Sequence, residues 1–367
     1  MPDRVYLVPG FFGFVNLGEF AYWGHVKRTL ETRLPGWPIH PVKTRPTATL
    51  PLRAQAVLDT IEATAEPEDR IHLVGHSTGG LDGRLVTAPG VVLPDGRPSR
   101  NATSVVSICS PHHGTPGARF FSTLQGKAAL RALSLATVFS IRTGRVPIRV
   151  LLKLGELVSH LGQAVYGGAG GLSDELFKSL LGEFSAERRD AIAEMLQDVG
   201  ADQALLPQLT ADAMQLFNAS NPKREGVRYG SVVAKAARPR LKGVLEAGLR
   251  PYAQAARALY TGCWNLAGAW SEGPAVSPPH ADRMLDVWEE LPTSRDNDGV
   301  VPTLSQPHGE LIACITADHL DVLGHFAGPD SHPPHYDWLP SGSRFDRAGY
   351  QRLWDDIATF LEGGPSE

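Results

Sequence analysis

The sequence contains little cysteine and no long uncharged apolar segment. Its three cysteines, Cys109, Cys263 and Cys314, lie far apart and form no CxxC pair, so neither a zinc ribbon nor a dithiol redox motif is indicated. No segment reaches the uncharged length that crosses a bilayer. The first apolar run breaks at Pro9, so no signal peptide is visible. These absences lead us to expect a cytoplasmic protein.

Charge of one sign is not in large excess either. The 367 residues carry 35 Lys and Arg against 39 Asp and Glu, a formal net charge of -4. Such a chain has no basic field to hold nucleic acid, which excludes that class of partner. Hydrophobic residues make up 42%, as in globular proteins, and the length suffices for one large α/β domain with insertions. The composition leaves the oligomeric state open.

Short apolar runs and helical patterns alternate along the sequence. Five apolar runs predict strands: 5–8, 71–74, 104–110, 227–233 and 312–315. Helical spacing predicts helices at 21–34, 52–65 and 348–361. Strands that alternate with helices are typical of a parallel sheet with helices on both faces.

The alternation stops after Pro116, where helical patterns continue without a convincing strand until the run at 227–233. We therefore expect an α/β core interrupted by a helical insertion. The core is expected to span 1–117 and 206–367, with an irregular helical excursion at about 236–295, and the insertion to span 118–205.

The sequence GHSTG at 75–79 follows a predicted strand directly and matches the pattern G-x-S-x-G. A serine hydroxyl attacks an acyl carbon well when it projects free of the sheet near a base, and a sharp strand-to-helix turn provides this. That turn strains the serine backbone and requires small neighbours, as Gly75 and Gly79 are. The segment also lacks the lysine of a phosphate-binding loop. Ser77 is therefore predicted to be a nucleophile.

A serine nucleophile needs a histidine base and a carboxylate, which in this kind of fold follow in the order Asp, His. The segment RDNDGVVP offers Asp298, favoured because it adjoins a glycine suited to a tight turn, and its rival Asp296. The segment ITADHLDVLGHF offers His319, favoured because it follows a strand-like run, and its rival His325. His308, close to a polar turn, is the weaker alternative.

With these residues identified, the chain resembles the bacterial triacylglycerol lipase and esterase family of the α/β-hydrolase superfamily. VPGFFGF is similar to the family's oxyanion loop, GHSTGGLDGR to its nucleophile elbow and SICSPHHGTP to a characteristic strand end. LTADAMQLFNASNP resembles the helix after its lid, and NDGVVP and DHLDVLGHF resemble its acid and base segments. The resemblance implies an α/β-hydrolase fold: a mostly parallel central sheet, helices on both faces and a large helical lid or cap insertion.

The resemblance also implies roles for single residues. It assigns Ser77 as nucleophile, Asp298 as acid and His319 as base, in agreement with the choices made from the motifs. It places the oxyanion hole at the backbone N–H groups of Phe11 and Thr78.

The implied activity is carboxylic-ester hydrolysis through an acyl-serine intermediate, with acyl esters, and lipid esters in particular, as substrates. Phe12, Phe14 and His76 are expected to contact the substrate. An acyltransferase that uses the same acyl-serine is an alternative, and so is a non-catalytic protein that binds lipid or a partner on a hydrolase scaffold.

No cofactor is expected, but the resemblance raises the question of a structural calcium near the histidine. Asp321 matches one ligand position of that site, whereas His325 falls near the place of an expected oxygen ligand, which a hard cation prefers. Asp321 is therefore a weak calcium candidate. His332 and His335 could mimic a metal pair, but a polar surface loop is the preferred interpretation.

The first part of the expected insertion, 118–155, contains basic residues and apolar clusters but no acidic residue. A basic amphipathic stretch can contact a lipid–water interface. Two interpretations remain open: a mobile lid over the serine, and a cap that packs permanently on the core.

Overall fold

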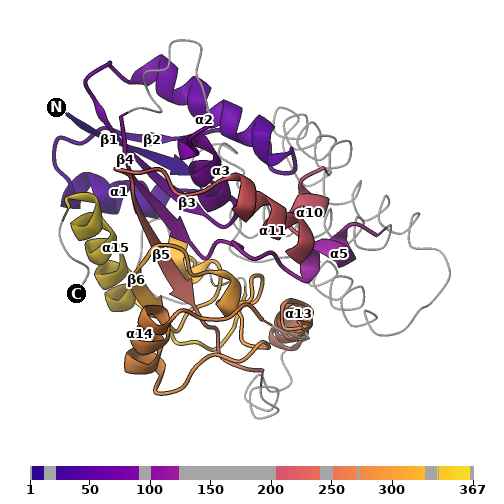
Figure 1. Ribbon diagram of the computed structural model, residues 1–367. Helices are drawn as coiled ribbons and strands as arrows, with labels where there is room; N and C mark the ends of the chain where they lie inside the picture. The colour runs from indigo at the N-terminus through magenta and orange to yellow at the C-terminus, as the bar shows by residue number, and fades with distance from the viewer. Residues whose placement is uncertain are drawn as a thin grey trace, which may run out of the picture.

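The computed structural model describes residues 2–11, 22–90, 101–123, 204–239, 251–270, 273–326, 337 and 339–363. In this part of the chain the strands form one six-stranded sheet of order β2-β1-β3-β4-β5-β6, and every neighbouring pair is parallel (Figure 1). The strands are β1 (Asp3–Val8), β2 (Ile39–Pro41), β3 (Arg70–His76), β4 (Ala102–Ile108), β5 (Arg228–Ala234) and β6 (Glu310–Ile315). The predicted α/β class with a parallel central sheet is confirmed.

Helices connect and cover these strands. The longer ones are α1 (Gly24–Arg33), α2 (Leu50–Thr64), α3 (Thr78–Thr87), α11 (Ala211–Ser220), α13 (Pro251–Ala267), α14 (Pro278–Trp288) and α15 (Arg347–Leu361). The short ones are α5 (Gly117–Phe121), α10 (Leu205–Gln208) and the 3-10 turns η2 (Thr303–Ser305) and η3 (Asp321–Leu323). Side-chain caps set several starts: the Thr49 hydroxyl accepts from Leu52 N before α2, and the Asp346 carboxylate accepts from Gly349 N before α15.

The two faces of the sheet bury separate apolar cores, because side chains alternate along each strand. On β1, Val5 and Leu7 pack into the core that contains α1 and α15 residues, whereas Tyr6 and Val8 pack into the core that contains α2 and α3 residues. In Figure 1 the sheet lies between these helix pairs. All six strand residues of β1 lie in the interior or close to it, as expected for a central parallel strand.

Three elements were not predicted as such. β2 has only three residues and includes Pro41, so it carries no strand-like run. α13 and α14 lie in the region expected to be irregular and helical, and α14 begins with two prolines at the first helical positions, where the missing N–H is tolerated.

The chain leaves the sheet after β4 and returns to it at β5. Thr115 N donates to Leu209 O at 2.9 Å, and α5 packs against α10, so the outgoing and returning segments lie side by side. Most of the expected insertion, residues 124–203, lies outside the described residues, so both interpretations of it stay predictions. Among the described helices, none has the length and apolar character that a bilayer crossing requires.

Candidate active site

Ser77 stands at a sharp turn between β3 and α3. Its φ of 55° and ψ of -126° place it in a region that residues with side chains rarely occupy, as expected where a nucleophile is held on a strained turn. A Cβ on Gly75 would lie 2.2 Å from the Gly79 carbonyl, and a Cβ on Gly79 would lie 2.1 Å from Val8 O. The two glycines are therefore required by backbone contacts, as the sequence pattern predicts.

Asp298 and His319 meet at the carboxyl end of the sheet. His319 Nδ1 lies 2.7 Å from Asp298 Oδ2, and His319 N donates to Asp298 O at 2.9 Å. Both side chains are almost fully buried. The other carboxylate oxygen, Oδ1, accepts from Val300 N at 2.9 Å and Val301 N at 2.7 Å. A carboxylate only accepts hydrogen bonds, so these backbone donors fix its orientation and that of the ring that faces it.

The rival residues are engaged elsewhere. Asp296 binds Arg238 through two 2.9 Å hydrogen bonds and also accepts from Thr293. Burial alone would raise the pKa of Asp296, but these hydrogen bonds outweigh it and lower the pKa below its ordinary value. The His325 ring packs edge-on against His25, and the His308 ring stacks on His112. The structure thus brings His319, and none of these rivals, to Asp298.

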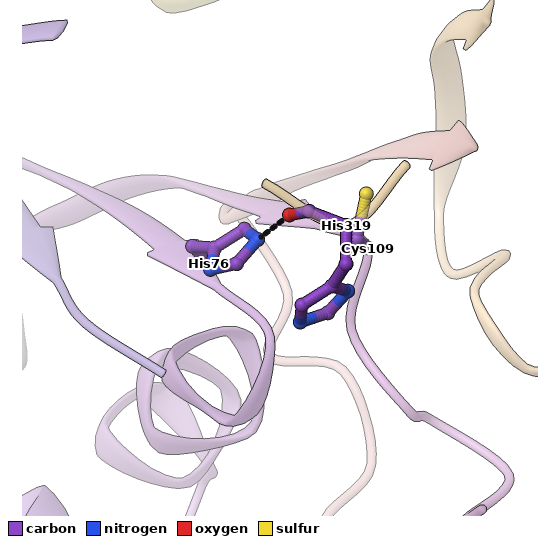
Figure 2. Close-up of side chains that lie close together, drawn as sticks. All are labelled: His76, Cys109 and His319. Carbon is purple, nitrogen blue, oxygen red and sulfur yellow. Dashed lines mark hydrogen bonds between the residues drawn. The ribbon is translucent and has the colours of Figure 1, made fainter. Parts of the chain in front are cut away.

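The serine turn and the histidine loop are joined through His76, the residue before Ser77. His76 Nε2 lies 2.8 Å from the His319 carbonyl oxygen, and the two ring centroids are 4.5 Å apart (Figure 2). Among the described residues no hydrogen bond joins the Ser77 hydroxyl to the His319 ring. Catalytic hydrogen bonds are often long in proteins without substrate and tighten when substrate binds.

His76, Cys109 and His319 also form a compact group, with ligand atoms all within 4.8 Å of one another (Figure 2). Each has another partner. The His76 ring bonds the Tyr22 hydroxyl, and the His319 ring bonds Asp298. The Cys109 thiol lies close enough to Asp298 for the carboxylate to act on it electrostatically. Burial, and then the Asp298 charge, raise the pKa of Cys109 well above its usual value, so the thiol stays protonated. Since the two rings are engaged in these hydrogen bonds and the thiol keeps its proton, we regard the group as part of the packing around the Asp298–His319 pair.

An apolar cavity opens at Ser77. It is lined by Phe11, Ser77 and Thr78. The other lining residues come from the loop after β4, from α5 and α10, and from the segment after Asp298: Pro111, Thr115, Gly117, Ala118, Phe121, Leu206, Leu209, Val300 and Val301. Phe12 and Phe14 lie outside the described residues. His76 is 1% exposed and does not line the cavity, so the structure does not bring it to the place where we expected a substrate contact.

A buried ion pair holds the loop that carries Phe11. Arg53 on α2 binds Asp82 on α3 at 2.7 Å, and both side chains are fully buried. The same guanidinium nitrogen of Arg53 donates to Pro9 O at 2.7 Å. Burial raises the pKa of Asp82 to about 6 although the charge of Arg53 opposes this. Removal of either partner would leave a buried unpaired charge, so the pair fixes the exit of the loop from β1.

Three carboxylates near His319 influence one another electrostatically: Asp318, Asp321 and Asp337. Asp318 and Asp321 are buried, and Asp318 Oδ2 and Asp337 Oδ1 are buried atoms without a hydrogen-bond partner among the described residues. Burial and the charge of Asp337 raise the pKa of Asp318 to about 8, and burial raises the pKa of Asp337 to about 6. Oxygen ligands with unused lone pairs are what a hard divalent cation such as calcium binds. The carboxylates of Asp318, Asp321 and Asp337 have the chemistry that calcium prefers, although the one group of described ligand atoms close enough together to hold a metal ion is that of His76, Cys109 and His319.

Sequence reasoning missed Tyr22, Arg53 and Cys109, each of which contacts the loops of this site. Tyr22 and Arg53 lie in helical patterns, and Cys109 lies at the end of an apolar run, so none carries a local signal of this role. A Cys109 φ of 51° shows that the end of β4, like the end of β3, is held in an unusual conformation.

Solved structures of similar fold include bacterial lipases and esterases. EstA from Clostridium botulinum has a TM-score of 0.57 and 17% identity, covering 100% of this chain and 88% of that chain. Lipase 1 from Pelosinus fermentans has a TM-score of 0.52 and 16% identity, covering 97% and 98% of the two chains. Staphylococcus hyicus lipase has a TM-score of 0.52 and 16% identity, covering 98% and 95%. This likeness confirms the α/β-hydrolase fold.

No family model matches the sequence, and no curated protein matches it.

Proposed function

We propose that the protein is a serine carboxylic-ester hydrolase that cleaves acyl esters through an acyl-serine intermediate. The observation that carries the proposal is the buried Asp298–His319 pair, joined through His76 to the strained turn at Ser77, which opens into an apolar cavity. The bacterial lipases and esterases of the same fold support the same class of reaction.

In the proposed reaction the Ser77 hydroxyl attacks the ester carbonyl carbon while His319 Nε2 takes its proton. Asp298 holds His319 with its proton on Nδ1 and stabilises the imidazolium that forms. The backbone N–H groups of Phe11 and Thr78 donate to the oxyanion. The alcohol leaves with the proton from His319, and a water molecule activated by the same ring then releases the carboxylic acid and restores Ser77.

The cavity supports an apolar acyl group as the part of the substrate that binds beside Ser77. Its walls are mostly aliphatic and aromatic and include Phe121, Leu206, Leu209, Val300 and Val301. Burial of each CH₂ group of an acyl chain in such walls contributes about 0.8 kcal/mol. We propose esters of apolar acids, lipid esters among them, as substrates.

The test uses p-nitrophenyl esters of graded acyl length together with a p-nitrophenyl alkylphosphonate. We expect nitrophenol release, and one phosphonyl group on the peptide that contains Ser77, found by mass spectrometry. The Ser77→Ala variant should take up no label. A wild-type protein that neither releases nitrophenol above the level of this variant nor takes up label at Ser77 would overturn the proposal.

We also propose that Asp318, Asp321 and Asp337 hold a structural calcium ion that fixes the loop carrying His319. Calcium at millimolar concentration is expected to raise the Tm by about 3 to 6 °C relative to protein in EDTA, because an ion that binds only the folded state stabilises it. Differential scanning calorimetry measures the shift. The Asp321→Asn variant should lose most of it.

The calcium effect should grow with pH. Because the pKa values of Asp318 and Asp337 are raised in the folded protein, the folded state without calcium holds extra protons, and its stability falls as pH rises between about 4 and 8. Calcium replaces these protons, so the Tm difference between calcium and EDTA should be larger at pH 8 than at pH 5. An equal Tm in calcium and EDTA at both pH values would contradict the proposal.

A further inference from the structure

A chain of hydrogen bonds crosses the site behind Ser77 and joins three separate loops. Gly10 N lies 3.3 Å from the Tyr22 hydroxyl, and this hydroxyl lies 2.5 Å from His76 Nδ1. On the other side of the ring, His76 Nε2 lies 2.8 Å from the His319 carbonyl oxygen (Figure 2). The chain thus runs from the predicted oxyanion loop, through the residue before the nucleophile, to the loop of the predicted base.

The chemistry of the groups fixes the direction of every bond in the chain. A carbonyl oxygen only accepts, so His76 Nε2 must carry the proton that it donates to His319 O. His76 Nδ1 is then an acceptor in the neutral ring, and the Tyr22 hydroxyl must donate to it. The Tyr22 oxygen in turn accepts from the N–H of Gly10. One tautomer of His76 satisfies all three contacts, whereas a protonated ring would place a donor against the Tyr22 hydroxyl.

Burial keeps the chain in this state. Tyr22 is 5% and His76 is 1% exposed. Burial, and then the nearby His319, lower the pKa of His76 well below its usual value, so the ring stays neutral at physiological pH. Burial also raises the pKa of Tyr22, so its hydroxyl keeps its proton.

We propose that Tyr22 and His76 are positioning residues that set the distance between the oxyanion loop and the loop of His319. The inference rests on the proposed ester hydrolysis, in which the Phe11 N–H and the His319 ring must act on the same substrate carbonyl. Gly10 directly precedes Phe11, and His76 bonds the main chain of His319 itself. A shift of either end of the chain would therefore move an oxyanion donor relative to the base.

The Tyr22→Phe variant is expected to lower kcat for p-nitrophenyl butyrate about 10- to 100-fold with KM changed less than about threefold, because small misplacement of catalytic groups slows the chemical step more than binding. His76→Phe keeps a ring of similar shape but loses both hydrogen bonds, so its kcat should be at least as low. The double variant should be no more than about threefold slower than His76→Phe, because residues that act through one chain are not additive. A double variant whose loss of kcat equals the product of the two single losses would overturn the proposal.

Two conservative variants separate the halves of the chain. The amide oxygen of His76→Asn stands near the place of Nδ1 and can still accept from Tyr22. The amide nitrogen of His76→Gln reaches the place of Nε2 and can still donate to His319 O. Each should recover part of the kcat lost in His76→Phe, and addition of Tyr22→Phe should lower kcat further in the Asn variant but leave it unchanged in the Gln variant. If Tyr22→Phe instead lowers kcat in the Gln variant and leaves it unchanged in the Asn variant, the proposed chain of hydrogen bonds is contradicted.

Tyr6→Phe is the matched control. Tyr6 on β1 is also a fully buried tyrosine, and its hydroxyl bonds Thr64 at 2.9 Å on the α2 side of the sheet. The Tyr6→Phe variant should be less stable than the wild type, because it loses a buried hydroxyl, while its kcat stays within about twofold of the wild-type value. If Tyr22→Phe and Tyr6→Phe have the same kcat, the positioning role is wrong although hydrolysis stands. If the wild type is no faster than Ser77→Ala, the proposed hydrolysis fails, and the positioning role fails with it.

A spectroscopic readout tests the chain without any substrate. In protein labelled with 15N-histidine, the signals that disappear in His76→Asn should show a neutral ring protonated on Nε2 from pH 5 to 9. Tyr22→Phe should move the His76 Nδ1 signal toward the position of a nitrogen without a hydrogen bond. A His76 ring protonated on Nδ1, or charged at pH 7, would overturn the direction of the chain.

Discussion

The Asp298→Asn variant is expected to hydrolyse p-nitrophenyl butyrate with a kcat about 1,000- to 10,000-fold below that of the wild type. Among the described residues, the hydrogen-bond partners of the Asp298 carboxylate are all donors: Val300 N and Val301 N at Oδ1, and His319 Nδ1 and Gln306 Nε2 at Oδ2. An amide would therefore turn its NH₂ group toward a donor in either orientation. If the NH₂ faces His319, the ring must place its proton on Nε2, where it can no longer accept the proton of Ser77.

The Asp296→Asn variant is the matched control, two residues away. Asp296 binds Arg238 and Thr293 and has no contact with His319 among the described residues. We expect its kcat to stay within about threefold of the wild type, with a lower Tm from the lost ion pair. Steady-state kinetics measures kcat, and calorimetry measures the Tm, for both variants. Equal losses of kcat would mean that the carboxylate has been assigned wrongly.

The Gly10→Val variant is expected to lose about 1,000-fold or more in kcat/KM, because an oxyanion donor is displaced and the nucleophile is crowded. A Cβ on Gly10 would lie 2.5 Å from Ser77 Cβ, 3.0 Å from His76 O and 3.2 Å from Ser77 Oγ. None of these atoms is the end of a flexible chain, so the oxyanion loop itself must move. Rates of phosphonylation of Ser77 should fall in parallel with kcat/KM.

Phe11→Leu should be far milder, although Phe11 is the residue whose N–H is proposed to donate. The donor belongs to the main chain, and leucine leaves that N–H in place while it keeps the cavity apolar. We expect kcat/KM to fall by no more than about fivefold. Most of this loss should be a higher KM, because leucine makes a smaller apolar contact with the substrate than phenylalanine does. Comparable losses in Gly10→Val and Phe11→Leu would contradict the assigned role of the loop.

The parts of the site that the sequence predicts are those built by local backbone geometry. Ser77 is recognisable because Gly75 and Gly79 must lie within a few residues of it on the same turn, and their roles follow from contacts under 3 Å. Asp298 is recognisable because Gly299, with a φ of 95°, supports the tight turn that brings Val300 N and Val301 N to the carboxylate. Central strands are equally visible, because burial on both faces leaves a continuous apolar run.

The parts that the sequence does not predict depend on pairs distant along the chain. Tyr22 and His76 are 54 positions apart, and nothing in either segment indicates the other. Asp337 lies in a polar stretch in which no local pattern distinguishes it from a surface acid, yet, after burial, its charge is the next cause that raises the pKa of Asp318. His76 is expected to contact the substrate, but side chains alternate in direction along a strand, and this one bonds Tyr22 and the His319 carbonyl instead of lining the cavity.

The contact between Thr115 and Leu209 has a consequence for the entropy of the fold. Because this hydrogen bond and the packing of α5 on α10 hold the two ends of the β4–β5 connection together, the connection is a closed loop. The entropy lost on closing a loop rises only with the logarithm of its length, by about 0.6 kcal/mol for each doubling. A change in the number of residues between Phe121 and Leu205 thus costs the sheet little closure entropy, and the ends of the strands that carry Ser77 and the Asp298–His319 pair keep their positions.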